Sequence, residues 1–282
     1  MKTLFRTSLL VIFGFGTCTI GHAAELKESL TLFASFDESA DADLAKGDAK
    51  IYTAADLSRA TLQTGIQTDK VSLAPKGRWG RGLDFSDNTK QVILFKGKGN
   101  LPYRDDGFDM TISFWMSVDP ENGLKPGYVD PLQITDKKWN DAAIWVDFSK
   151  DDKPRHFRLG VLSDLKHWNP DNADWDKMAP EKRPLVTVTK TPFAGDKWTH
   201  VAITLDNINA GDSSGRAVLY LDGKSQGEIK GNLKYSWDME KVAAMLGIAF
   251  IGQIDEFAIF STALSADDVN KLMNHDGGIG KL

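Results

Sequence analysis

Two stretches of this sequence combine tryptophan with amide and carboxylate side chains. One contains Trp139 and Asn140, and the other reads Trp168-Asn-Pro-Asp-Asn-Ala-Asp-Trp175. An indole ring offers a flat apolar surface and one N–H donor, and the neighbouring side chains add hydrogen-bond donors and acceptors. A stacking surface with fixed hydrogen bonds suits the binding of a sugar. The candidate ligand-binding residues are Trp139, Asn140, Trp168, Asn169, Asp171, Asn172 and Trp175.

Both stretches lie in or beside segments longer than a hairpin needs, residues 119–140 and 163–184. Long loops on a rigid sheet are where binding residues commonly occur. Tryptophans in such loops also serve to pin the loop to the sheet beneath it. The sequence leaves this alternative open for each of the three indoles.

Strict alternation of apolar and polar residues predicts the strands that must carry these loops. In residues 111–118, for example, Ile112, Phe114 and Met116 share one face, whereas Trp115 points the other way. In residues 30–37 the same rule places Leu30 and Leu32 on one face. Many short strands separated by turn signals predict an all-β fold, an antiparallel β-sandwich or jelly roll. Further alternating segments are residues 144–148, 157–161 and 201–205.

The C-terminal region predicts one short helix. Ser265 can cap it, and Asp268 stands at the third helical position, as in a capping box. Leu264 and Val269 are spaced as a hydrophobic staple. We therefore expect a strand, a turn and a closing helix.

Several segments, in this order, resemble the laminin-G-like, concanavalin A-like lectin/glucanase jelly-roll family over about residues 30–275. The resemblance implies a single jelly-roll domain at residues 24–282. The segments are Phe33-Ala-Ser-Phe-Asp37, Gly77-Arg-Trp-Gly-Arg-Gly-Leu-Asp-Phe85, Lys197-Trp-Thr-His-Val-Ala-Ile-Thr-Leu205, Ala217-Val-Leu-Tyr-Leu-Asp-Gly-Lys224 and Gly252-Gln-Ile-Asp-Glu256.

The glucanases of this family carry paired carboxylates on one strand, so that both acids flank one glycosidic bond. This chain has Gln253, Asp255 and Glu256 instead, and neighbouring strand residues are expected to point to opposite faces. We therefore favour a non-catalytic protein. An atypical active site would require other acids to meet in space, such as Asp147, Asp164, Asp171, Asp174 and Asp176.

The resemblance also implies a structural Ca²⁺ ion, with Asp255 as one ligand and Asp37 as a second carboxylate. Ca²⁺ takes about six to eight oxygen ligands, including backbone carbonyls that a sequence does not reveal. The alternative is that Asp255 accepts hydrogen bonds from a neighbouring loop.

The first residues read as a cleaved secretory signal peptide, residues 1–23. Lys2 and Arg6 precede an apolar centre at residues 9–15, and small residues follow at Gly21-His-Ala23. Cleavage removes both cations, so the net charge falls from −5 to −7, and it removes Cys18, the only cysteine. An acidic surface argues against nucleic acid or an anionic membrane as partner. No apolar stretch is long enough to span a membrane.

Together these features predict an exported protein, periplasmic, on the cell surface or secreted. We expect a non-catalytic carbohydrate-binding or adhesion module that recognises a polysaccharide or glycan. Two alternatives remain. One is a glycoside hydrolase or lyase with an atypical site. The other is a protein–protein interaction module of a surface assembly, whose partner is a surface protein.

Overall fold

The computed structural model describes residues 25–282. The predicted signal peptide, residues 1–23, lies outside the described residues. A helical segment at residues 25–29 leads into the first strand. Within residues 25–282, no helix has the length and apolar character needed to cross a membrane.

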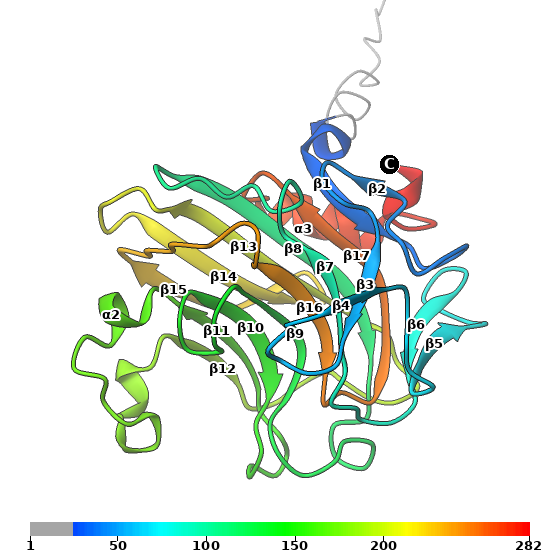
Figure 1. Cartoon of the computed structure of the whole chain (residues 1–282), viewed down its shortest axis with the longest axis horizontal. Coiled ribbons are helices and arrows are strands. Elements are labelled where there is room, and N and C mark those ends of the chain that lie inside the picture. The colour runs from blue at the N-terminus through cyan, green and yellow to red at the C-terminus, as the bar shows by residue number, and fades with distance from the viewer. Residues whose placement is uncertain (1–24) are drawn as a thin grey trace, which may run out of the picture.

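Two antiparallel sheets form a sandwich, as the alternation predicts (Figure 1). The first, sheet A, runs in the order β15-β14-β13-β8-β17-β1-β2, with β6 on β17 and β5 on β6. Its strands are β1 (Leu30–Ala34), β2 (Leu44–Ala45), β5 (Val71–Ala74), β6 (Gly82–Phe85), β8 (Phe108–Ser117), β13 (Thr199–Ile208), β14 (Gly215–Leu221), β15 (Lys224–Gly231) and β17 (Gly252–Phe260).

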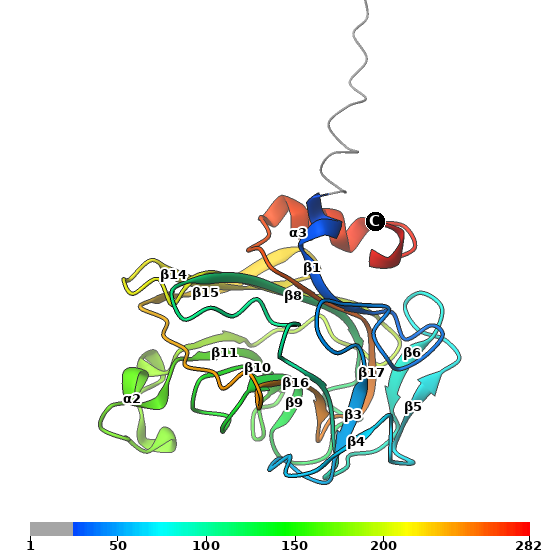
Figure 2. The same cartoon turned by 45° about the horizontal axis from the view of Figure 1, so that its top comes forward.

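Sheet B runs in the order β12-β11-β10-β9-β16-β7-β3-β4. Seen from the side, the two sheets lie as two layers, with the C-terminal helix on the outer face of sheet A (Figure 2). The strands of sheet B are β3 (Ile51–Ala54), β4 (Leu62–Thr64), β7 (Val92–Lys96), β9 (Val129–Thr135), β10 (Ala143–Phe148), β11 (Phe157–Leu162), β12 (Leu185–Val188) and β16 (Ala243–Ile248).

The main core lies between the sheets and is built from the residues that the alternation places inward. Ile112, Phe114 and Met116 of β8 are buried there, while Trp115 lies on the outer face of sheet A. The prediction for the first strand is wrong at Leu30. An irregularity in the pairing of β1 with β17 between Leu30 and Leu32 puts Leu30 in a second cluster beneath the C-terminal helix.

A bulge in β17 changes the expected directions of the acidic pair. Glu256 has a left-handed backbone (φ 53°), and the pairing with β8 shifts between residues 255 and 258. An extra residue of this kind breaks the alternation of the strand. Asp255 and Glu256 consequently both contact loops outside sheet A, so the expectation that they point to opposite faces is wrong.

The closing helix forms as predicted. In α3 (Ala266–Asn274), Ser265 accepts from the backbone N–H of Asp268 and the Asp268 side chain returns the bond, which completes the capping box. Val269 and Leu264 pack in the cluster on the outer face of sheet A. A 3₁₀ turn, η3 (Ile279–Lys281), follows. The loop between β11 and β12 holds α2 (Leu165–Trp168), η1 (Trp175–Lys177) and η2 (Pro180–Lys182).

Candidate functional site

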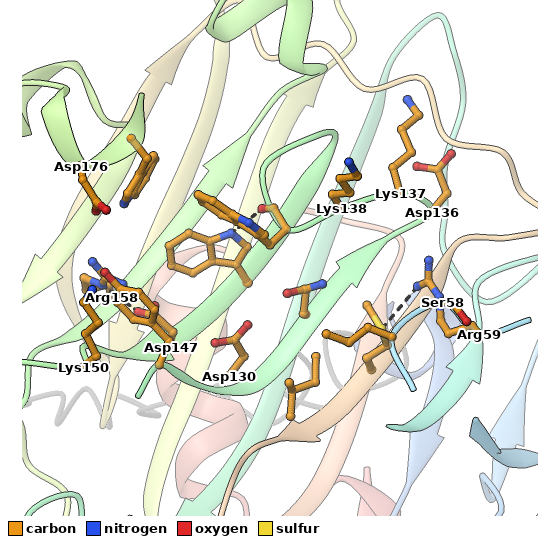
Figure 3. Close-up of a pocket in the computed structure, with 18 residues that line it drawn as sticks. Ser58, Arg59, Asp130, Asp136, Lys137, Lys138, Asp147, Lys150, Arg158 and Asp176 are labelled. Atoms are coloured by element: carbon orange, nitrogen blue, oxygen red, sulfur yellow. Dashed lines mark hydrogen bonds and ion pairs between the residues drawn. The ribbon is translucent and has the colours of Figure 1, made fainter. Parts of the chain in front are cut away.

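A cavity of about 710 Å³ lies on the outer face of sheet B (Figure 3). Its floor consists of strand residues that alternate with core residues. Gln133, for example, lines the cavity, while its neighbours Leu132 and Ile134 are buried in the core. Loop residues 57–59, 136–139 and 175–176 form walls. The floor residues are Asp130, Gln133, Trp145, Asp147, Arg158, Met245 and Ile248.

The indole ring of Trp145 occupies space on the floor that is free because the residue opposite it has no side chain. Trp145 pairs with Gly160 of the neighbouring strand. A Cβ atom at residue 160 would lie 2.4 Å from the indole ring of Trp145, so only glycine leaves space for the ring. The Trp145 indole N–H donates to the carbonyl of Trp139 at 2.9 Å, which ties the wall to the floor.

An ion pair occupies one end of the floor. Arg158 Nε donates to Asp147 Oδ1 at 2.8 Å, and an Nη2 bond to Oδ2 completes a two-bond contact. The guanidinium also lies 5.1 Å from the ring of Tyr128 and 5.7 Å from that of Trp145. Planar stacking and two parallel hydrogen bonds fix an arginine in one orientation. The pair therefore presents a rigid polar surface to the cavity.

Asp130 lies beside this pair because β9 carries an irregularity. The pairing of β9 with β10 shifts between Val146 and Phe148, so Asp147 faces an extra residue of β9. Burial raises the pKa of Asp130 well above its usual value, and the neighbouring Asp147 raises it further against the opposing effect of Arg158. Burial also raises the pKa of Asp147, and Arg158 opposes that rise. The arrangement thus favours a protonated Asp130 that can donate as well as accept.

Three large apolar side chains of the described residues are strongly exposed, and all three line this cavity. They are Leu57 at 51%, Tyr128 at 41% and Trp139 at 41% exposure. Exposed apolar surface that gathers in one concave place marks a binding site more often than scattered residues do. Two of these residues are aromatic rings that can stack on a ligand.

The tryptophans of the two long loops gather at one wall. The ring of Trp175 lies 5.2 Å from that of Trp139 and 6.0 Å from that of Trp168, both edge to face. Trp139 and Trp175 line the cavity, whereas Trp168 donates its indole N–H to the carbonyl of Asn140 at 3.0 Å. Trp168 therefore has the loop-pinning contacts that the sequence left open as an alternative.

The polar candidates of the second loop lie away from the cavity. Asn169 is buried and exchanges two hydrogen bonds with the backbone of Ala173, which closes the loop on itself. Asp171 and Asn172 are exposed and do not line the cavity. Asn140 contributes its carbonyl to Trp168 rather than its side chain to the cavity.

Several cavity residues escaped the sequence-based selection, Arg59, Tyr128, Asp130, Gln133 and Arg158 among them. A signal was available for Arg158. The alternation in residues 144–148 and 157–161 leaves Asp147 and Arg158 outward-facing on successive strands, where they pair across the two strands. Arg59 gave no signal, because its loop between β3 and β4 reaches the site only through the fold.

The predicted metal ligands lie on the opposite side of the sandwich. Asp255 accepts hydrogen bonds from the N–H groups of Arg78 at 2.7 Å and Trp79 at 3.2 Å, and Asp37 accepts from that of Arg81 at 2.8 Å. Residues 25–282 contain no group of three or more acidic, His or Cys residues arranged to hold a metal. N–H groups repel a cation, so these contacts fit the hydrogen-bonding alternative. Calcium binding remains a prediction.

A family model for the concanavalin A-like lectin/glucanases superfamily, Laminin_G_3, matches residues 86–270. No curated protein matches the chain.

Solved structures with the same fold are similar to this chain at low identity. Domain 4 of AbnA, an extracellular GH43 arabinanase from Geobacillus stearothermophilus in complex with arabinotriose, gives a TM-score of 0.53 at 15% identity, over 87% of this chain and 98% of that domain. The binding domain of botulinum neurotoxin DC in complex with SialylT gives 0.57 at 16%, over 88% of this chain and 52% of the toxin domain.

The same toxin domain, in complex with rat synaptotagmin II, gives 0.58 at 16% identity over 88% and 52% of the two chains. This chain therefore spans about half the length of the toxin domains. At these identities the likeness shows a shared fold.

Proposed function

The chain belongs to the concanavalin A-like lectin/glucanase superfamily, and we propose that it is a carbohydrate-binding protein that holds a glycan in the cavity on the outer face of sheet B. The observation that carries this proposal is the convergence of exposed apolar side chains. Leu57, Tyr128 and Trp139 all line that one cavity. Exposing them to water costs free energy that a ligand with an apolar ring face would recover.

The floor supports the proposal because it offers fixed polar groups beneath the rings. Gln133, Asp130 and the Asp147–Arg158 pair face the cavity. Hydroxyl groups of a sugar both donate and accept hydrogen bonds, and amide and carboxyl side chains can meet both needs. The cavity volume of about 710 Å³ falls in the range of small-ligand sites.

Solved structures of the same fold lend further support. One similar domain was solved with arabinotriose, and another with SialylT. Those ligands belong to those proteins, and they show only that this fold can present sugars.

A hydrolase is the second candidate, favoured by the neighbouring carboxyl groups of Asp130 and Asp147. A raised pKa suits Asp130 to the role of general acid. Both oxygens of Asp147 are held by Arg158, which opposes a role as nucleophile. Release of reducing ends from a bound glycan, abolished in Asp130→Asn, would establish this activity in place of simple binding.

Export is part of the proposal and rests on the pattern of residues 1–23. Amino-terminal sequencing of the protein from expressing bacterial cells should find Ala24 first and the protein outside the cytoplasm. A cytoplasmic protein that retains Met1 would contradict it.

A glycan array followed by calorimetry tests the binding function. We expect the wild-type protein to bind at least one glycan class and Trp139→Ala to bind it roughly thirtyfold more weakly, a loss of about 2 kcal/mol. Asp171→Ala is the matched control, because Asp171 is a loop residue outside the cavity. Equal affinities of Trp139→Ala and wild type, or loss of binding in Asp171→Ala alone, would place the site elsewhere. No binding to any glycan would contradict the proposed function.

A further inference from the structure

Arg59 has an unfavourable backbone conformation at the edge of the cavity. It lies in the loop between β3 and β4 with a left-handed backbone, φ 53°. Residues other than glycine adopt this backbone conformation at a cost in free energy, and such residues cluster at functional sites. One guanidinium nitrogen, Nη1, donates to the carbonyl of Thr135 at 2.8 Å and contacts Met245 Sδ at 3.3 Å. The side chain is therefore fixed against sheet B.

The charge of Arg59 has no close ion-pair partner in this position. Among the carboxylates of residues 25–282, none forms an ion pair with Arg59, although Asp136 lies near enough to favour its charge. Burial lowers the pKa of Arg59. The Asp136 Oδ2 atom accepts from the N–H of Asp238 at 3.0 Å, and its buried Oδ1 atom has no hydrogen-bond partner among the described residues. A partly buried cation without an ion pair is costly and calls for an explanation.

Arg59 also stands where two cavities meet. A second cavity of about 310 Å³ shares Ser58, Arg59 and Asp136 with the first one. The two cavities therefore adjoin at these three residues, with Arg59 in the lining of both, and we call the two together the groove. Lys137 and Lys138 lie beside Asp136, and Arg59 lies next to Ser58 on the other side of Asp136 from them (Figure 3).

The groove is more cationic than the molecule around it. The chain has a net charge of −5, yet basic residues outnumber acidic ones along the first cavity. Asp147 is already neutralised by Arg158. Lys137 is held by Asp164 at 3.6 Å, whereas Lys138 is exposed and forms no ion pair with a described residue. Arg59 and Lys138 thus remain available to a ligand.

We propose that Arg59, assisted by Lys138, binds an anionic group of the glycan, so that the ligand class is an acidic polysaccharide carrying carboxylate or sulfate groups. This inference rests on the proposed function. A guanidinium meets a carboxylate or a sulfate with two parallel hydrogen bonds. A polymer laid along the groove would place one such group between the two cavities and its neighbouring sugars in either half.

Matched polymer pairs test the inference. Polygalacturonate is compared with the same polymer after reduction of its carboxyl groups, and dextran sulfate with dextran. We expect at least tenfold tighter binding of the charged member in one pair, and the pair identifies the anion as carboxylate or sulfate. Added salt should weaken this binding, because screening acts on ionic contacts.

Variants of Arg59 separate recognition from folding. Arg59→Gln should weaken binding of the charged polymer about ten- to hundredfold and should weaken binding of its neutral counterpart clearly less. Arg59→Lys should retain part of the affinity, because it keeps the charge but not the planar fork. Lys76→Gln is the control, since Lys76 is an exposed lysine outside both cavities. Melting temperatures of all variants check that the fold is intact.

Two outcomes overturn the inference. The first is the absence of any preference for the charged ligand. It would be seen as equal binding of charged and neutral members in both pairs, or as recognition of neutral glycans alone on the array. In that case the proposed carbohydrate-binding function stands and only the ligand class fails. The other is full binding of the charged polymer by Arg59→Gln. Failure to bind any glycan is a different result, because it contradicts the proposed function itself.

Discussion

Asp255 and Glu256 are buried carboxyl groups whose hydrogen-bond partners are backbone N–H groups. Glu256 accepts from Ile279, and Asp255 accepts from Arg78 and Trp79. Burial, with a smaller contribution from neighbouring carboxyl groups and against the opposing backbone N–H bonds, raises the pKa of Asp255 to about 7 and that of Glu256 to about 8. The folded protein therefore holds protons there that the unfolded chain releases.

This raised pKa makes a prediction for Glu256→Gln. A folded-state pKa of about 8 against 4.5 in the unfolded chain stabilises the protein below pH 4.5, and this contribution is lost as the pH rises through 8. The wild-type free energy of unfolding should fall relative to that of Glu256→Gln by on the order of 3 kcal/mol between pH 5 and pH 9. Urea unfolding of both proteins at each pH measures it, with exposed Glu181→Gln as control. Parallel pH profiles would show that Glu256 is ionised in the fold.

The burial of His200 predicts a dependence of stability on pH that has the opposite sign. His200 is buried beside Trp115, with Nε2 at 2.9 Å from Ser113 Oγ and no hydrogen-bond partner at Nδ1. Burial lowers its pKa from 6.5 to about 4, so the folded state disfavours the charged ring. Stability should fall by about 3 kcal/mol as the pH drops from 6.5 to 4.

His200→Gln should lose this acid dependence while keeping a partner for Ser113. Urea unfolding at pH 7 and at pH 4.5 gives the comparison, and exposed His167→Gln is the matched variant. An unchanged acid dependence in His200→Gln would assign the effect to other groups.

At the scale of the element, β10 and β11 bring Trp145, Asp147 and Arg158 to one face of sheet B. The pairing of Trp145 with Gly160 makes this possible. We predict that Gly160→Ala destabilises the protein by about 1–3 kcal/mol and weakens glycan binding, because the added methyl displaces the indole. Denaturant unfolding and calorimetry measure the two effects. Gly280→Ala is the control, where a Cβ atom would lie 3.5 Å from Phe33 in ordinary contact. Wild-type binding in a folded Gly160→Ala would contradict a role for Trp145 in glycan binding.

The elements show what a sequence can and cannot specify here. The alternation predicts which strand residues enter the core, because each strand has one buried face. It fails where an extra residue breaks the period, as at Glu256 and near Leu30. The tryptophan loops were recognisable by composition, and Trp139 and Trp175 do line the cavity. The role of Trp168 depends on a hydrogen bond to Asn140, which no local pattern encodes.

Arg59 shows the limit most clearly. It reaches the site because β3 and β9 lie in the same sheet, with β16 and β7 between them. The proximity of Arg59 to β9 depends on the strand order of the whole sheet, and no pattern in residues 55–61 predicts it. Prediction of the site therefore required the three-dimensional arrangement.

At the scale of the whole molecule, the two outer faces of the sandwich differ in what covers them. The outer face of sheet A is covered by α3 and the C-terminal turn, whereas that of sheet B carries the groove. Calcium would act on the covered face, at Asp37 and Asp255. The family resemblance predicts that Ca²⁺ raises the melting temperature and chelator lowers it, since a ligand of the folded state stabilises it.

The hydrogen bonds of Asp255 predict instead that the melts with Ca²⁺ and with chelator coincide. A calcium-dependent shift that disappears in Asp255→Asn would establish the metal site. Identical melts would remove the metal from the account.

The central claim is that the outer face of sheet B binds a glycan, and the indole N–H groups report on it directly. The chain has eight tryptophans. Trp139 and Trp175 line the cavity on sheet B, and Trp79 packs on Trp115 at sheet A, so their nuclear magnetic resonance signals distinguish the two faces. Single Trp→Phe variants assign the signals. On titration with a bound glycan, we predict that the Trp139 and Trp175 signals shift and that those of Trp79 and Trp115, on sheet A, stay in place. Shifts at Trp79 and Trp115 with Trp139 and Trp175 unmoved would contradict the account.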